Sequence, residues 1–224
     1  MVKRSRASYS DDSMVAKKSK GQANKRNPVY RALRSMLERK YLDTQSGYID
    51  FNTTNPIGST YAISNIAEGN DYNNRQGRAI TGLYVQLDFY AYMDALTANP
   101  TTAIPWTWHL VVDKQANGTL QGYNVLFDET IVTNSFASFK NLASNDDRFV
   151  ILKTECGTVD LNGNGPFHKR YFIKIPQHCS QIRYPGTTAA VPNTNGIIFA
   201  ISGAAASVLD GYFNIVTRLV FLDV

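Results

Sequence analysis

The strongest constraint on the fold is a run of alternating apolar and polar side chains at residues 79–93. Successive side chains of a β-strand point to opposite faces, so this alternation predicts a strand with one face in the core. The residues expected on the core face are Leu83, Val85, Leu87, Phe89, Ala91 and Met93. Those expected on the opposite face are Tyr84, Gln86, Asp88, Tyr90 and Tyr92.

The same period recurs along the rest of the chain. Residues 106–113 place Trp106, Trp108, Leu110 and Val112 on one side, and residues 211–221 do so with Phe213, Ile215, Leu219 and Phe221. Further strands are predicted at 148–154, 169–175 and 196–202, separated by polar turns. One short helix is expected around 124–140. Strands joined by polar loops indicate an all-β sandwich or barrel rather than an α/β fold.

The first 26 residues have a different composition. They are rich in Ser, Lys, Arg, Asn and Gly and have little apolar surface to bury, so we expect a disordered arm at 1–26. A short amphipathic helix is predicted at 27–41, because Asn27 suits the N-cap, Pro28 suits the first turn, and apolar residues recur every four positions. Residues 42–224 are then the sandwich domain.

Charge is divided unevenly between these parts. Residues 1–40 contain twelve basic and three acidic residues, a net charge of +9, whereas the chain as a whole carries +5. A basic tail on a mildly acidic body is typical of polyanion binding, here of phosphates. The residues predicted to bind nucleic acid are Lys3, Arg4, Arg6, Lys17, Lys18, Lys20, Lys25, Arg26, Arg31, Arg34, Arg39 and Lys40.

The two cysteines, Cys156 and Cys179, match neither a metal motif nor a disulfide framework, which favours reduced thiols in an intracellular protein. The first twenty residues lack the apolar stretch of a signal peptide. The most apolar run, 196–209, is shorter than the roughly 18 to 20 residues that span a bilayer, so no membrane partner is expected.

Two segments carry a family resemblance. They are Ile-Ala-Glu-Gly-Asn-Asp-Tyr-Asn-Asn-Arg-Gln-Gly at 66–77 and Asp-Arg-Phe-Val-Ile-Leu-Lys at 147–153. Both resemble segments in small viral capsid proteins of the satellite tobacco necrosis virus type and of circular single-stranded DNA viruses that encode a replication initiator. Glu68 stands where Gln is usual, and Thr154 replaces an Asp that could serve at a subunit contact or an ion site.

The resemblance implies a single jelly-roll β-sandwich of two antiparallel sheets that closes into a T=1 icosahedral shell of sixty copies, with the arm turned inward. Sixty arms of +9 would neutralise on the order of 540 phosphates of a single-stranded genome. The basic clusters also fit a nuclear import signal, so DNA is favoured over RNA. We therefore expect a virion protein that binds a host import receptor and enters the nucleus during infection.

The two motifs supply a second group of predicted residues, assigned to a structural motif or a subunit contact. For Arg75 the favoured role is structural, as a partner of a carboxylate or of backbone carbonyls in a tight turn leading into the strand at 79. An intersubunit contact is the alternative. The group consists of Gly69, Asp71, Arg75, Gly77, Arg148 and Lys153.

No catalytic or metal site is predicted, and no cofactor. His109, His168 and His178 lack metal-binding spacing. Asp160, Asn162, Asn164 and Gly165 begin a calcium-loop pattern, but Tyr171 occupies the position that needs a bidentate Glu. A polar turn is favoured there, while the family resemblance leaves calcium at subunit contacts open. The alternatives to a capsid protein are a non-viral nucleic-acid-binding jelly roll and a lectin-like or cupin-like module.

Overall fold

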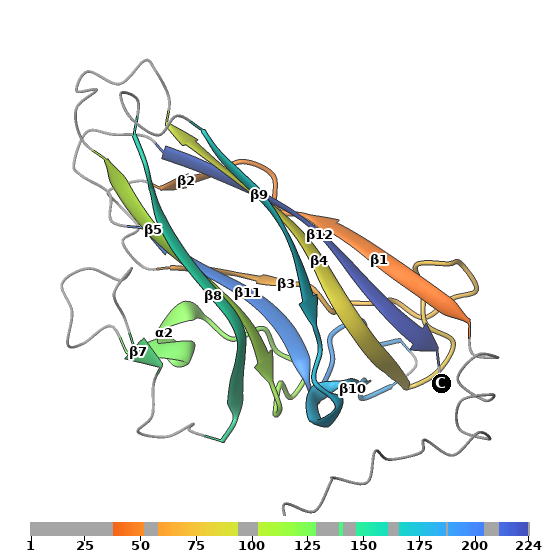
Figure 1. Cartoon of the computed structure of the whole chain (residues 1–224). Helices are drawn as coiled ribbons and strands as arrows, with labels where there is room; N and C mark the ends of the chain where they lie inside the picture. The colour runs from red at the N-terminus through yellow and green to blue at the C-terminus, as the bar shows by residue number, and fades with distance from the viewer. Residues whose placement is uncertain are drawn as a thin grey trace, which may run out of the picture. The chain divides into compact units, whose positions relative to one another are not determined.

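Two antiparallel sheets make up most of the part of the chain that the structure describes (Figure 1). The structure is a computed structural model, and it describes residues 38–51, 58–93, 103–128, 139–140, 147–160, 166–186, 188–203 and 211–223. Both sheets lie within one compact unit, Leu37–Val224.

Sheet A has six strands in the described residues. Its central strand β12 (Gly211–Asp223) pairs with β1 (Arg39–Gln45) and β2 (Ile49–Phe51) on one side and with β4 (Ala79–Met93) on the other. The second side of β4 pairs with β9 (Phe167–Lys174) and β10 (Gln181–Arg183). β4 has 15 residues, and its bounds are those predicted from the alternation of apolar and polar side chains.

Sheet B has four strands in the same described part of the chain. Their order is β3 (Ser59–Ala62), β11 (Gly196–Gly203), β5 (Ile104–Asp113) and β8 (Phe149–Val159). The short elements outside the two sheets are α2 (Tyr123–Leu126), η2 (Gln177–Cys179) and the paired strands β6 (Phe127–Asp128) and β7 (Phe139–Lys140).

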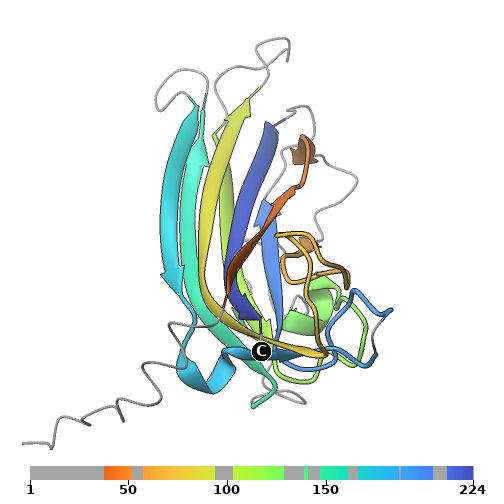
Figure 2. The same ribbon diagram turned by 90° about the vertical axis from the view of Figure 1, so that its right-hand side faces the viewer.

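The chain passes repeatedly from one sheet to the other. β1, β4, β9, β10 and β12 lie in sheet A, whereas β3, β5, β8 and β11 lie in sheet B, all in antiparallel pairs. In Figure 2 the long strands of both sheets lie along roughly the same axis, with their arrows pointing in opposite directions. Two antiparallel sheets connected in this way form a jelly-roll β-sandwich, which confirms the predicted fold.

The core lies between the two sheets and is largely aromatic. The ring of Phe89 in sheet A lies 4.7 Å from Trp106 and 6.4 Å from Phe199, both in sheet B. Phe167 and Phe213 of sheet A contact the same ring, with centroids 6.0 and 6.5 Å away. The core faces predicted for the strands at 106–113 and 211–221 are confirmed, because all eight residues assigned to them are buried in this cluster.

The side of sheet B that faces away from sheet A is also covered. Val111, Phe149 and Ile198 of the sheet pack there in a second cluster with Tyr123 and Phe127 from α2 and β6. As a result β5 is buried on both faces over most of its length. This explains why residues 107, 109 and 111 are buried although the alternation assigned only one face of the strand to the core.

One predicted core residue, Leu83, is displaced by a β-bulge. Val220 of β12 pairs with Tyr84 while the next residue, Phe221, pairs with Gly82, so Leu83 is the extra residue in β4. The alternation shifts by one position at this point. Ile80 and Gly82 are buried before the bulge, the odd-numbered residues from Val85 onward are buried after it, and Leu83 is only partly buried.

The two helix predictions need correction. Residues 39–41 were placed at the end of a helix, but they begin β1, whose seven residues all pair with β12; residues 27–37 lie outside the described residues. The helix expected around 124–140 is the four-residue α2, and the chain continues as β6 and, at Phe139–Lys140, as β7. Within the described residues, no helix is long and apolar enough to cross a membrane.

Candidate functional site

Arg75 anchors the loop that precedes β4. Its side chain is fully buried, and its guanidinium donates hydrogen bonds to the carbonyls of Ile66 at 3.2 Å, Gly186 at 2.9 Å, Ala189 at 2.7 Å and Gly77. These carbonyls come from both ends of the loop and from the segment after β10. Backbone carbonyls are one of the two kinds of partner expected for Arg75, and its assignment to a structural role stays a prediction.

The tight turn around Asp71 explains the glycine of the same motif. Gly69 donates its N–H to the carbonyl of Arg75 at 3.0 Å, and Asn74 donates to the carbonyl of Asp71 at 3.0 Å. A Cβ atom on Gly69 would lie 2.4 Å from the side-chain nitrogen of Asn74. A larger residue at 69 would have to displace the Asn74 side chain, so glycine allows the close packing seen here.

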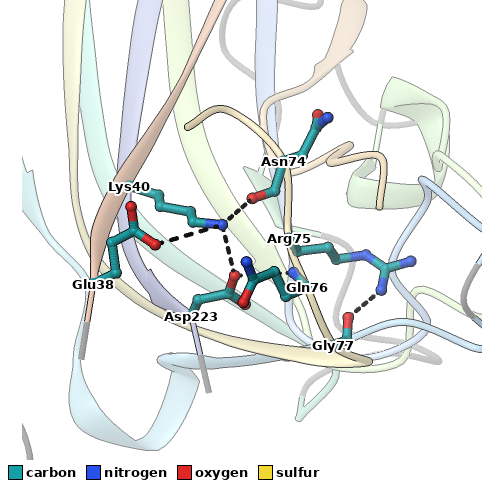
Figure 3. Close-up of polar contacts among 7 residues, drawn as sticks. All are labelled: Glu38, Lys40, Asn74, Arg75, Gln76, Gly77 and Asp223. Carbon is teal, nitrogen blue, oxygen red and sulfur yellow. Dashed lines mark hydrogen bonds and ion pairs between the residues drawn. The ribbon is translucent and has the colours of Figure 1, made fainter. Parts of the chain in front are cut away.

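Lys40 joins the loop to the first and last strands of sheet A (Figure 3). Its ammonium lies 3.0 Å from the Asp223 carboxylate and 3.9 Å from that of Glu38, and it donates to the carbonyl of Asn74 at 3.2 Å. The Asp223 carboxylate also accepts the N–H of Gln76 at 2.9 Å. Lys40 is only 1% exposed, so it does not present its charge to a phosphate as predicted.

The charged residues of the second motif form two further contacts. Arg148 donates two hydrogen bonds of 2.8 Å to Asp113, a fully buried carboxylate at the end of β5. Because Asp113 accepts these bonds, the pKa of Arg148 is raised above its ordinary value. Lys153 lies 3.2 Å from Glu155, which also pairs with Lys169 of β9 at 3.0 Å. Arg148 therefore links the start of β8 to β5 within sheet B, and Glu155 links the middle of β8 to β9 at the edge of sheet A.

Glu155 is held in its charged form by these lysines. Partial burial disfavours the carboxylate, but hydrogen bonds from Lys169 and Lys153 outweigh burial and hold the pKa of Glu155 below its ordinary value. On the neighbouring strand, His109 is buried under the ring of Phe127 at 4.2 Å, and Nδ1 shares a hydrogen bond of 2.8 Å with Thr154. Burial lowers the pKa of His109 to about 4, so the ring is neutral at pH 7.

The comparisons with known proteins cover most of this chain. The profile of the "Geminivirus coat protein/nuclear export factor BR1 family" matches residues 1–191. The chain belongs to this family. The match confirms the predicted resemblance to capsid proteins of small single-stranded DNA viruses, whereas the resemblance to satellite tobacco necrosis virus-type capsids stays a prediction.

Two solved structures with similarity to this coat protein are BFDV capsid proteins. The chain is 10% identical to the 60-mer form, with a TM-score of 0.35, and the match covers 84% of this chain and 93% of that one. For the decameric form the identity is 12% and the TM-score 0.36, with 84% and 99% covered. The comparison with curated proteins gives no match.

The predicted phosphate-binding residues of this coat protein fall mostly outside the described part of the chain. That holds for every predicted position from Lys3 to Arg34. Arg39 is exposed at the start of β1, whereas Lys40 is buried. Of the calcium-loop pattern, Asn162, Asn164 and Gly165 also lie outside. The described residues contain no group of three or more His, Cys, Asp or Glu side chains placed to hold a metal ion.

Sequence reasoning missed the carboxylates that complete these contacts. Asp223, Asp113 and Glu155 lie 147, 35 and 14 residues from the groups they bind, Gln76, Arg148 and Lys169. Only the folded arrangement of the two sheets and their loops brings these pairs together. The sequence does contain a sign of two of these carboxylates. Asp113 and Asp223 each end a strongly apolar strand, and a carboxylate buried there needs a charged or hydrogen-bonding partner.

Proposed function

We propose that sixty copies of this coat protein assemble into a T=1 shell that packages a single-stranded genome through the basic N-terminal segment. The family match carries the proposal, because it assigns the chain to a coat-protein family and includes the basic segment as well as most of the sandwich. A jelly roll suits shell assembly, since its loops meet neighbouring copies around symmetry axes.

The charge available for packaging is smaller than the whole sequence count. Lys40 is neutralised inside the protein by Asp223, so the segment that binds phosphate is the one before Glu38. Residues 1–37 contain ten basic and two acidic residues, a net charge of +8. Sixty copies would neutralise on the order of 480 phosphates, and a longer genome would need other counterions.

We further propose that the packaged genome is DNA and that the basic clusters at 3–6 and 17–26 bind a host import receptor, so that the protein enters the nucleus. Lysine and arginine contact DNA and RNA phosphates alike, so charge alone does not select the nucleic acid. The family description, which names a nuclear export factor, supports a nuclear stage. DNA as the genome agrees with that stage.

The test is to express the full chain and examine the product by electron microscopy, nuclease digestion and sequencing of the contents. We expect closed particles of uniform size that protect single-stranded DNA. A variant with the basic residues of 3–26 changed to Gln should keep a folded sandwich and lose most of the protected nucleic acid. A matched variant with the serines of that segment changed to Gln should retain it. Monomers under all salt and pH conditions would refute assembly, and unchanged DNA content in the Gln variant would refute packaging by this segment.

A further inference from the structure

The solvent-facing side of sheet A carries an unusual number of aromatic rings. They alternate along the strands with the buried core residues, and adjacent strands bring them into register. We use the term aromatic face for Tyr41 on β1, Tyr84, Tyr90 and Tyr92 on β4, Phe172 on β9 and Tyr212 on β12. Phe172 is 70% exposed, and the other five rings are partly exposed in the described sandwich.

The rings form two neighbouring groups on one sheet. Tyr92 stacks on Tyr212 with centroids 5.3 Å apart and contacts Tyr90 at 5.4 Å. Toward the other end of β4, Tyr84 and Phe172 are 6.4 Å apart. Six residues of strand separate Tyr84 from Tyr90, which corresponds to roughly 20 Å. That span accommodates several nucleotides of an extended single strand.

The charges on this face suit a polyanion. Asp43 accepts two hydrogen bonds from Arg218, of 2.7 and 2.6 Å, and Asp88 accepts two from Arg170 through separate oxygens, of 3.0 and 2.7 Å. Each outward-facing carboxylate described on β1, β4, β9 and β12 is thus neutralised by an arginine. Lys174 adds a positive charge beside Tyr84. The guanidinium of Arg218 also lies 4.4 Å from the ring of Tyr41.

Chain connectivity links this face to the basic segment. β1, the strand at which the basic segment joins the sandwich, is part of sheet A and carries Tyr41. A nucleic acid held by the segment is therefore tethered to the sheet with the exposed rings. Aromatic side chains on an open sheet stack unpaired bases without regard to sequence, because every base has a π-face.

We propose that the aromatic face of sheet A is a stacking surface for the unpaired bases of a single-stranded nucleic acid. This inference rests on the proposed packaging function and deepens it: the basic segment neutralises phosphates, and sheet A holds bases. The two contributions differ in their response to salt, because counterion release weakens phosphate contacts as salt rises while stacking persists.

The test is to titrate a fluorescently labelled oligothymidine of about twelve nucleotides, a length within known single-strand site sizes, into the full chain over a series of salt concentrations. We expect the Tyr90→Ala, Phe172→Ala double variant to bind at least about tenfold more weakly at high salt, with an unchanged slope of log affinity against log salt. The Tyr90→Phe, Phe172→Tyr variant keeps both rings and should bind like the wild type.

Ile151→Ala is the matched control, because it removes a partly exposed apolar side chain from sheet B. It should leave binding unchanged. The inference is overturned if the double alanine variant binds like the wild type at every salt concentration. It is also overturned if that variant loses assembly while oligothymidine binding is unchanged, since the face would then be a contact between subunits. The packaging proposal fails in a different way. It is contradicted if deletion of residues 2–26 leaves the slope of log affinity against log salt unchanged.

Discussion

The two sheets of the sandwich have the same antiparallel pairing but are used differently. In sheet B all eight residues of β11 and nearly all of β5 are buried, because one face packs on sheet A and the other on α2 and β6. In sheet A, β4 alternates between buried and partly exposed residues on either side of the bulge at Leu83. β5 and β11 are therefore committed to the core on both faces, whereas β4 has one face available for contacts with a partner.

The largest expected difference between the sheets concerns two aromatic residues. Trp108 of sheet B is fully buried between Phe199 and Tyr171, so Trp108→Ala should lower the free energy of unfolding by about 3–5 kcal/mol. Phe172→Ala on the exposed side of sheet A should change it by about 0.5 kcal/mol or less. Urea unfolding of the unassembled chain, followed by far-UV circular dichroism, measures both. Similar losses would contradict the division of roles.

Sheet A also contains a buried polar contact whose loss should be nearly as costly. Asp223→Ala would leave the ammonium of Lys40 buried without its closest carboxylate, and we expect a loss of about 2–4 kcal/mol in the same assay. A Lys40→Met, Asp223→Leu double variant removes both charges and should be less destabilised than the single variant. If the double variant is less stable than Asp223→Ala, the Lys40–Asp223 ion pair stabilises the fold by more than it costs to bury the two charges.

His109, on β5 of sheet B, makes the free energy of unfolding depend on pH. Its pKa in the folded protein is about 4, below the ordinary value of 6.5, so the unfolded chain takes up a proton first as the pH falls. The stabilisation is complete above about pH 6.5 and is lost between pH 6.5 and 4, with a total on the order of 2–3 kcal/mol.

The measurement for His109 is urea unfolding at several pH values, for the wild type and for His109→Gln. Carboxylates also titrate near pH 4, so the quantity to compare is the difference between the two proteins. The free energy of unfolding of the wild type minus that of His109→Gln should decrease as the pH falls from 7 to 4, because the Gln variant has no imidazole to protonate. A constant difference would show that His109 is accessible to solvent in the folded protein.

These contrasts also show what the sequence could predict. The bounds and most of the core face of β4 could be read directly, because fifteen residues of alternation leave little choice of structure. The same reading missed β1. Residues 39–45 form a strand that pairs with β12, and the charges of Lys40 and Asp43 are matched by Asp223 and Arg218 from the far end of the chain. Long-range pairing of this kind overrides local propensity.

The candidate site also has features that the sequence predicts and features that depend on the fold. The loop motif predicted a tight turn before the strand, and the backbone hydrogen bonds of Gly69 and Asn74 form one. The structural role of Arg75 stays a prediction. The charge count also placed Lys40 among the phosphate-binding residues, since a count along the sequence does not reveal burial. The aromatic face could not be recognised before the structure, because its rings come from four strands and its carboxylates are paired with arginines only in the folded sheet.

The smallest expected effect concerns the exposed ion pair between Arg218 and Asp43. Both side chains are nearly half exposed, so Arg218→Gln should leave the free energy of unfolding almost unchanged, despite bonds as short as those of the buried contacts. The same urea assay with Asp43→Asn and the double variant gives the coupling energy. A coupling as large as that of the buried Lys40–Asp223 pair would make this pair part of the stabilising framework of sheet A. A small coupling leaves neutralisation of a carboxylate on the aromatic face as the main consequence of the pair, and oligothymidine binding should then fall in Arg218→Gln even though stability does not.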